Sequence, residues 1–375
     1  MLGTGTIISA FRISVKMVIH VVRIPQANTE GGSVRDHAFW NYFADRVWVK
    51  TIPLHNNKLQ NIMRLIPLIA CRNRTILLHI SASGFPIFNN TWIGFLACFL
   101  YLKWIRYVST RNYVFLEFND LFVEQAKDLR ISIPVNYAKI ESKIFSMPIQ
   151  CFIFASDEMR IYAARKYDLP HKKTLTIING DEIPGNIPQK YILPVTHGRL
   201  KFIYAGTLNK GREIEGMINA FLKTSCDLIL VGSQGEWIKS NYTHVNNIFY
   251  LGMIDVEAVR LLIRDCDVGV IPYPQNRMYY NIAYPTKLSS YITAGIPILS
   301  TPVSEVCKVL DAHPGIGVAL DISEWFSWIE NLSTHGLSEM KARIALIRQQ
   351  FTWGNIIQPL ELVLTQVNST SDMRN

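Results

Sequence analysis

The sequence predicts an α/β chain of two domains, each built on a parallel sheet. With 375 residues, the chain is long enough for two domains of about 180 residues, each with its own core. In the C-terminal half, short apolar segments alternate with segments of helical spacing, which is typical of parallel strands joined by helices. Apolar residues make up 49% of the chain and charged residues 18%, which is typical of a globular chain on the hydrophobic side.

Glycines follow several of the strands predicted in the C-terminal half. These strands are expected at 200–204, 227–231, 247–251, 268–272 and 296–299, with helices at 211–222, 255–264 and 288–293. Gly206, Gly232 and Gly252 each come directly after a predicted strand or close to its end. Because such sheets bind ligands at the carboxyl ends of their strands, these loops mark the expected site.

Residues 284–301, with the sequence YPTKLSSYITAGIPILST, contain the strongest candidate for a ligand site. A Pro-Thr-Lys turn leads into the helix expected at 288–293, and Gly295 ends that helix. Unpaired N–H groups at a helix start attract anions, and Lys287 adds a fixed cation. The pattern predicts a site for a nucleotide diphosphate; the alternative is an ordinary helix–strand corner with a solvated Lys287.

Several segments, taken in order, resemble one enzyme family. FIYAGTLNKGREIEGMINAF (202–221), LILVGSQGEW (228–237), NNIFYLGMI (246–254) and RDCDVGVIPYP (264–274) resemble the donor domain of family-4 glycosyltransferases. The segment YNIAYPTKLSSYITAGIPIL is similar to those of bacterial surface-polysaccharide and adhesin glycosyltransferases. The resemblance implies the GT-B architecture, in which two Rossmann-like domains face each other across a cleft.

The resemblance and the composition together predict the domain boundaries. Prolines cluster at 181–196, which is therefore the expected hinge. The predicted parts are an acceptor-binding domain at 1–186 with 1–16 as an extension, a nucleotide-sugar-binding domain at 187–350, a helix at 351–367 that crosses back to the first domain, and a tail at 368–375.

The positive charge of the chain lies in its N-terminal half. Residues 1–185 hold 22 Lys and Arg against 13 Asp and Glu, whereas residues 186–375 hold 16 of each. Between Asp45 and Glu117 there is no acidic residue, and the aromatic stretch TWIGFLACFLYLKWIRYV (91–108) lies in this interval. Apolar and aromatic residues beside cations predict attachment to an anionic membrane surface.

Other interpretations of the aromatic stretch remain open. It could be a plain buried helix of the α/β domain, whereas the apolar run is too short to favour a transmembrane span. We predict no nucleic acid partner, because no nucleic-acid-binding motif accompanies the basic residues.

The six cysteines are dispersed and show neither paired nor metal-ligating spacing. They predict reduced thiols and hence a cytoplasmic protein. If the protein attaches to a membrane, we expect it at the inner face of the cytoplasmic membrane. The only DxD pattern, at 265–267, precedes a buried strand and is expected to be structural. We therefore predict no metal and no cofactor, with the nucleotide sugar acting as a substrate.

The N-terminal domain supplies the predicted acceptor and catalytic residues. Gly31 and Gly32 open a helix where the backbone can approach an acceptor closely, and Arg35 follows one turn later. His79 lies near the end of the strand expected at 75–83, and it is a catalytic candidate or a packed side chain.

Asn119 and Asp120 end the strand expected at 113–120 and are the other catalytic candidates. The resemblance implies a histidine near this strand end that helps to hold the transferred sugar, and Asn119 is its counterpart here. The alternative for Asp120 is an N-cap of the helix that follows.

The resemblance also implies an Arg and a Lys that hold the diphosphate after the first strand of the donor domain. Here Thr207 follows Gly206 in the position of the Arg, Lys210 keeps the cation, and Arg212 is expected to replace the missing Arg. Preorganised cations stabilise the charge that develops on the leaving diphosphate.

Further donor contacts are implied around Lys287. Ser290 occupies the position where the family tends to place a ribose-binding Glu. Asn281 is expected to face the sugar, and Glu305 is expected either to bind the ribose or to cap a helix.

These inferences predict a glycosyltransferase of hexosyltransferase type that acts in polysaccharide biosynthesis. The donor is a nucleotide sugar, with UDP as the expected nucleotide, and the acceptor is a lipid-linked or membrane-presented glycan. The resemblance implies that the anomeric configuration is retained. The alternatives are a GT-B-fold nucleotide-sugar epimerase and a catalytically inactive sugar-nucleotide-binding partner subunit.

Overall fold

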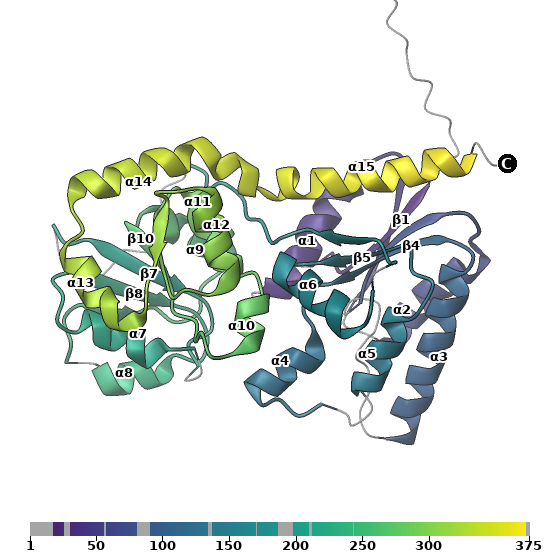
Figure 1. Ribbon diagram of the computed structural model, residues 1–375, viewed down its shortest axis with the longest axis horizontal. Helices are drawn as coiled ribbons and strands as arrows, with labels where there is room; N and C mark the ends of the chain where they lie inside the picture. The colour runs from purple at the N-terminus through teal and green to yellow at the C-terminus, as the bar shows by residue number, and fades with distance from the viewer. Residues whose placement is uncertain are drawn as a thin grey trace, which may run out of the picture.

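The computed structural model describes residues 18–25, 31–55, 58–80, 91–133, 137–169, 171–186, 198–209, 212–242 and 244–372. The chain forms two six-stranded parallel sheets with the strand orders β2-β1-β3-β4-β5-β6 and β12-β11-β10-β7-β8-β9 (Figure 1). This arrangement confirms the predicted α/β class with two Rossmann-like domains. The extension predicted at 1–16 and most of the predicted hinge lie outside the described residues.

The first sheet and its helices form the N-terminal domain. Its central strands are apolar and buried because helices cover both faces of the sheet. The strands are β1 (Ile19–Arg23), β2 (Val49–Pro53), β3 (Thr75–His79), β4 (Tyr113–Phe118), β5 (Cys151–Phe154) and β6 (Thr174–Thr176). The helices are α1 (Gly31–Ala44), α2 (Lys58–Leu65), η1 (Ile66–Ala70), α3 (Trp92–Ser109), α4 (Phe122–Leu129), α5 (Tyr137–Phe145) and α6 (Asp157–Lys166).

The second sheet forms the C-terminal domain, which is the predicted donor domain. Five of its strands lie within about two residues of the predicted ranges, whereas its last strand was not predicted. The strands are β7 (Lys201–Ala205), β8 (Asp227–Val231), β9 (Ile248–Tyr250), β10 (Val268–Ile271), β11 (Ile298–Ser300) and β12 (Gly317–Ala319). Its helices are α7 (Ile214–Phe221), α8 (Glu236–Tyr242), α9 (Val256–Arg264), α10 (Met278–Ile282), α11 (Thr286–Ala294), α12 (Ser304–Ala312), η2 (Ile322–Glu324), α13 (Trp325–Glu330), α14 (Thr334–Ile347) and η3 (Arg348–Phe351).

The last helix, α15 (Trp353–Asp372), leaves the donor domain and packs on the N-terminal domain (Figure 1). Its buried residues Trp353, Ile357 and Leu360 share a core cluster with Phe39 and Phe43 of α1. The helix continues to Asp372, beyond the end predicted at residue 367. Burial of this apolar face holds the first turns of α15 against the N-terminal domain.

Polar contacts also join the two domains. The carboxylate of Asp181 accepts hydrogen bonds from Arg260 Nε at 2.6 Å and from Ser290 Oγ at 2.5 Å. On the other side of the interface, Ser156 Oγ donates to the backbone oxygen of Ile282. These bonds connect the N-terminal domain to α9, α10 and α11 of the donor domain.

Helix α3 presents two different faces. Cys98, Tyr101 and Ile105 are buried against the N-terminal core, whereas Trp92 is 74% exposed and Phe99 is 55% exposed. The interpretation as a plain buried helix therefore holds for one face only. In the described part of the chain, no helix is long and apolar enough to cross a membrane.

Candidate functional site

Lys287 and Gly206 meet at the carboxyl end of β7. Gly206 directly follows this strand and has a φ of +149°, a backbone conformation that favours glycine. A Cβ atom on Gly206 would lie 2.7 Å from Nζ of Lys287, so the ammonium group rests against the glycine backbone. Only glycine permits this approach, and the contact places a buried cation beside the strand end.

Tyrosine side chains hold this cation. Nζ of Lys287 donates to the hydroxyl of Tyr273 at 3.0 Å, and it lies 4.8 Å from the ring centroid of Tyr204. Burial alone would lower the pKa of Lys287, but the neighbouring hydroxyls of Tyr204 and Tyr273 outweigh burial and the pKa is raised. The lysine therefore stays charged at neutral pH.

Arg212 is the second cation at this position. Its guanidinium carbon lies 5.9 Å from the ring centroid of Tyr273, the tyrosine that also contacts Lys287. The buried Nε of Arg212 has no hydrogen-bond partner among the described residues. An anionic ligand between Arg212 and Lys287 would supply that partner. We refer to Gly206, Arg212, Tyr273 and Lys287 as the cation site.

Several predicted donor residues have partners within the protein. Ser290 bonds to Asp181, and Asn281 Nδ2 donates to the backbone oxygen of Gln275 at 2.6 Å. Glu305 accepts from the backbone N–H of Glu158 at 2.7 Å. This carboxylate thus caps the first turn of α6 in the other domain, as in the helix-capping alternative for Glu305.

The other two donor candidates, Thr207 and Lys210, follow β7 in the sequence. The backbone oxygen of Thr207 accepts from the Tyr204 hydroxyl at 2.8 Å, which fixes this loop against the cation site. Lys210 lies outside the described residues.

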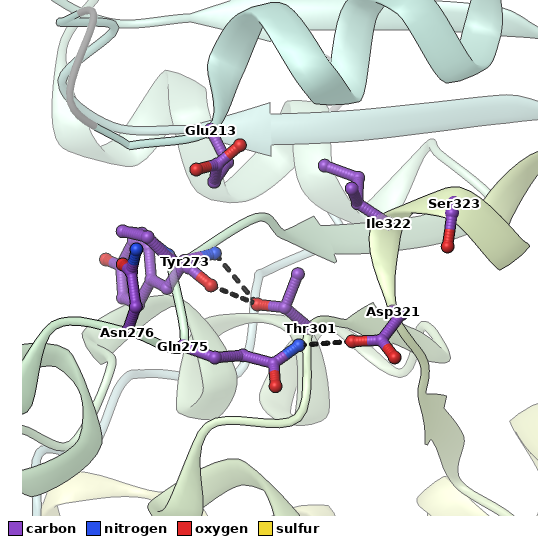
Figure 2. Close-up of a pocket in the computed structure, with 9 residues that line it drawn as sticks. Glu213, Tyr273, Gln275, Asn276, Thr301, Asp321, Ile322 and Ser323 are labelled. Atoms are coloured by element: carbon purple, nitrogen blue, oxygen red, sulfur yellow. Dashed lines mark hydrogen bonds between the residues drawn. The ribbon is translucent and has the colours of Figure 1, made fainter.

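A cavity of about 350 Å³ opens beside the cation site (Figure 2). Its lining comes from the segments after β10, β11 and β12 and from the start of α7. The lining residues are Glu213, Tyr273, Pro274, Gln275, Asn276, Thr301, Asp321, Ile322 and Ser323. None of these was predicted as a site residue from the sequence. Their position directly after apolar strands is the signal that could have found them.

The cavity wall is held by hydrogen bonds between loops. Thr301 Oγ1 accepts from the backbone N–H of Tyr273 at 3.0 Å and donates to its backbone oxygen at 2.6 Å. Gln275 Nε2 donates to Asp321 Oδ1 at 2.5 Å (Figure 2). The side chains in the wall are therefore preorganised by their neighbours.

His79 is oriented by a carboxylate in the N-terminal domain. Its Nδ1 lies 2.8 Å from Asp36 Oδ1, and Asp36 also accepts from Arg23 at 3.0 Å. The buried Nε2 of His79 has no partner among the described residues. An imidazole fixed by a carboxylate through one nitrogen can exchange a proton through the other. Asp36 was missed in the sequence because it lies 43 residues before His79.

Asp120 faces the donor domain. Its Oδ1 accepts from the hydroxyl of Tyr279 in α10 at 2.7 Å. Helix α4 starts at Phe122 with Leu121 as the N-cap residue, so the alternative that Asp120 caps this helix is wrong. Asn119 lies half-buried beside it, directly after β4.

A substitution at Asp120 tests the environment of its carboxyl group. Burial raises the pKa of Asp120 from 3.8 to about 6, while the hydrogen bond from Tyr279 partly opposes this. The carboxyl group therefore favours the folded state fully below pH of about 4, and this contribution is lost as pH rises through about 6. Asp120→Asn is expected to stabilise the chain by about 1–3 kcal/mol at pH 7 and by almost nothing at pH 4. Urea denaturation at both pH values measures the difference, and an equal effect at the two pH values would contradict it.

Arg35 lies in the interior of the N-terminal domain, where all its hydrogen-bond partners among the described residues are groups of that domain. Its guanidinium contacts Glu117 and donates to the backbone oxygens of Ile177, at 2.7 Å, and Ile178, at 2.9 Å. The side chain is fully buried, so the expectation that Arg35 meets an anionic acceptor does not fit its position. Gly31 and Gly32 do open α1, as expected.

No protein-family model matches the sequence, and no curated protein matches it. The solved structures do match. Sucrose-phosphate synthase from Thermosynechococcus elongatus has a TM-score of 0.64 and 14% identity, with 95% of this chain and 100% of that chain covered. A glycosyltransferase from Rickettsia africae has a TM-score of 0.61 and 12% identity, with 94% and 98% covered.

A third match is WaaG, a glycosyltransferase involved in lipopolysaccharide biosynthesis, with a TM-score of 0.58 and 13% identity over 93% of this chain and 99% of that chain. At such identities the likeness concerns the fold, and it extends over both domains. The chain therefore has the two-domain GT-B fold that these glycosyltransferases share.

Proposed function

We propose that this chain is a glycosyltransferase that transfers a sugar from a nucleotide-sugar donor to a glycan acceptor at a membrane surface. The observation that carries this proposal is the cation site. Lys287 and Arg212 lie at the carboxyl edge of the donor-domain sheet, and the unpaired Nε of Arg212 lacks an anionic partner among the described residues. UDP is the nucleotide that we expect.

The chemistry of the cation site suits the loss of a nucleoside diphosphate. When the bond between the sugar and the distal phosphate breaks, negative charge grows on the phosphate oxygens. Fixed cations stabilise this charge more in the transition state than in the ground state, and they need no reorganisation. Lys287 is fixed by Tyr273 and by the backbone of Gly206, so it meets this requirement.

His79 and Asp120 are the groups that we propose for the acceptor side. His79 ends β3, Asp120 closely follows the neighbouring strand β4, and Asp120 reaches the donor domain through Tyr279. A hydroxyl of the acceptor that enters between the domains would meet groups able to bind it and to accept its proton.

Thermal denaturation with a panel of nucleotide sugars, followed by an assay for product on glycolipid acceptors, tests the proposed function. A ligand that binds the folded chain raises its melting temperature by mass action. Stabilisation by a UDP-sugar together with product formation would support the transferase. Stabilisation without any turnover would favour an inactive sugar-nucleotide-binding subunit, and no response to any nucleotide would contradict the proposal.

An exposed apolar patch on the N-terminal domain supports the membrane part of the proposal. Large apolar side chains on α2, η1 and α3 are at least 40% exposed, and η1 packs against α3. The patch consists of Ile62, Met63, Ile66, Ile69, Trp92, Ile93, Phe95, Leu96, Phe99 and Leu100. In Figure 1, α2 and α3 lie at the end of the molecule farthest from the donor domain.

Cations border this patch. Lys103 and Arg106 are exposed on α3, and the ammonium group of Lys103 lies 5.3 Å from the ring centroid of Phe99. Arg111 lies over the ring of Tyr107 at 4.0 Å. Apolar burial and attraction to anionic lipid headgroups would act together here, as two signals for one attachment.

The triple variant Lys103→Glu, Arg106→Glu, Arg111→Glu is expected to bind anionic vesicles at least about a hundredfold more weakly than the wild-type chain. Each cation near an anionic surface contributes about 1 kcal/mol, and the introduced carboxylates are repelled. Co-sedimentation with phosphatidylserine-containing vesicles measures the effect, with phosphatidylcholine vesicles as the neutral reference. Binding should also weaken as salt is added.

A matched triple on the donor domain, Lys223→Glu, Lys239→Glu, Arg343→Glu, makes the same charge change on exposed residues away from the patch. It is expected to bind nearly as well as the wild type. Equal binding of the wild-type chain to neutral and anionic vesicles, or no binding to either, would refute the membrane part of the proposal.

A further inference from the structure

The cavity in Figure 2 borders directly on the cation site, and Tyr273 is the residue that they share. Its hydroxyl accepts a hydrogen bond from Lys287 on one side, while the residue also lines the cavity. In a nucleotide sugar, the sugar is bonded to the distal phosphate. The proposed function places that phosphate at the cation site. The sugar must then lie directly beside the cation site, and the cavity is the space that borders it there.

The lining of the cavity combines apolar side chains with polar ones, and the charge of its ionisable side chains is negative. It carries the carboxylates of Glu213 and Asp321, and no Lys or Arg is among the described residues that line it. Such a lining repels phosphate and carboxylate groups but provides acceptors for hydroxyl groups. The amides of Gln275 and Asn276 add donors as well as acceptors.

The two carboxylates lie on opposite sides of the cavity (Figure 2). Asp321 is fixed, because it accepts from Gln275 and also caps the short helix η2. Glu213 precedes α7 in a left-handed backbone conformation with a φ of 55°. A group placed between them is therefore close to negative charge from two directions.

We propose that this cavity receives the sugar of the donor and that Glu213 and Asp321 select a neutral hexose over a uronic acid. The selection rests on repulsion: a hexuronate carries a carboxylate where the hexose carries a neutral hydroxymethyl group. Repulsion from two carboxylates across the cavity disfavours the anionic sugar, while the neutral sugar donates hydrogen bonds to the same oxygens. This inference rests on the proposed function, since it needs a diphosphate at the cation site.

Calorimetric binding of matched ligands tests the selection without any need for an acceptor. The probes are UDP, UDP-glucose with UDP-glucuronic acid, and UDP-galactose with UDP-galacturonic acid. The wild-type chain is expected to bind at least one hexose about tenfold more tightly than its uronate. In the double variant Glu213→Gln, Asp321→Asn, this ratio is expected to fall to about one to threefold, mainly because the uronate binds more tightly.

The double substitution keeps the size of both side chains, and Asn can still cap η2. Glu339→Gln makes the same kind of charge change on an exposed residue of α14, and it should leave the ratio unchanged. Unchanged binding of UDP shows that the double variant is folded and that its cation site is intact. Equal affinity of the wild type for hexose and uronate, or a ratio that neutralisation does not alter, would overturn the inference. Absence of binding by UDP and by all four UDP-sugars would instead refute the UDP-linked donor of the proposed function.

Discussion

Replacing Lys287 with methionine is expected to lower kcat/KM by about 30-fold to 1,000-fold, or about 2–4 kcal/mol in transition-state stabilisation. Lys287 is the buried cation at the end of β7, and its ammonium group lies against Gly206. Methionine keeps the apolar stem between Tyr204 and Tyr273 but removes the charge. Steady-state kinetics with the best donor, together with calorimetric binding of UDP, measures the loss.

Lys223→Met is the matched control, because Lys223 is an exposed lysine of the same domain. It should retain wild-type kinetics. A Lys287→Met variant that folds, binds UDP normally and keeps full activity would place the phosphate site elsewhere. If UDP affinity falls but the chemical step in single-turnover kinetics does not, Lys287 binds the donor without stabilising the transition state.

Replacing Glu117 with glutamine is expected to destabilise the N-terminal domain by about 3–5 kcal/mol. The Glu117 carboxylate lies between the guanidinium groups of Arg23 and Arg35, and all three side chains are fully buried. Glutamine removes the negative charge, so Arg35 loses its carboxylate partner and Arg23 keeps only Asp36. Urea denaturation followed by the fluorescence of the tryptophans measures the change in the free energy of unfolding.

Glu361→Gln is the control for this experiment, because Glu361 pairs with Arg46 at 3.1 Å in a partly exposed position. This variant is expected to lose less than about 1 kcal/mol. A loss of similar size for Glu117→Gln would mean that the buried ion pairs contribute little. Failure of the Glu117 variant to fold would agree with the expectation.

The pH dependence of the same variant follows from the pKa of Glu117. Burial alone would raise this pKa, but Arg23 and Arg35 outweigh burial and lower it from 4.5 to about 2. The carboxylate therefore stabilises the folded state fully above pH of about 4.5, and this stabilisation is lost as pH falls towards 2. The difference between the wild type and Glu117→Gln should shrink over that interval.

Local signals in the sequence were sufficient to predict five strands of the donor-domain sheet, whereas the short edge strand β12 was not predicted. The strand β8 occupies the predicted range 227–231, and β7, β9 and β10 differ from their predicted ranges by one residue at either end. An apolar run that ends in glycine indicates a buried strand and the turn that follows it. Each strand can therefore be predicted from its own segment alone. The Gly206 loop and the Lys287 turn were both expected at the carboxyl ends of strands, and the contact between them is a finding of the structure.

Long-range partners could not be predicted in this way. Arg35 has the spacing of a residue that could meet an acceptor, yet in the fold it bonds to Glu117 and to the backbone oxygens of Ile177 and Ile178. Ser290 similarly holds a ribose-binding position in the resemblance but bonds to Asp181 across the domain interface. A polar side chain bonds to the partners that the fold brings within hydrogen-bond distance. These partners can lie far away in the sequence, so the spacing of residues does not predict them.

The sequence by itself determined the α/β class, five parallel strands of the donor domain and the cation at the start of α11. These depend on local hydrophobic periodicity and on glycine, whose effects act over a few residues. Only the tertiary structure decided that one face of α3 is exposed while the other joins the core, that Asp36 orients His79, and that Glu213, Tyr273 and Asp321 line one cavity. Each of these depends on contacts between segments far apart in the chain, because the packing of helices on the sheets fixes which side chains meet.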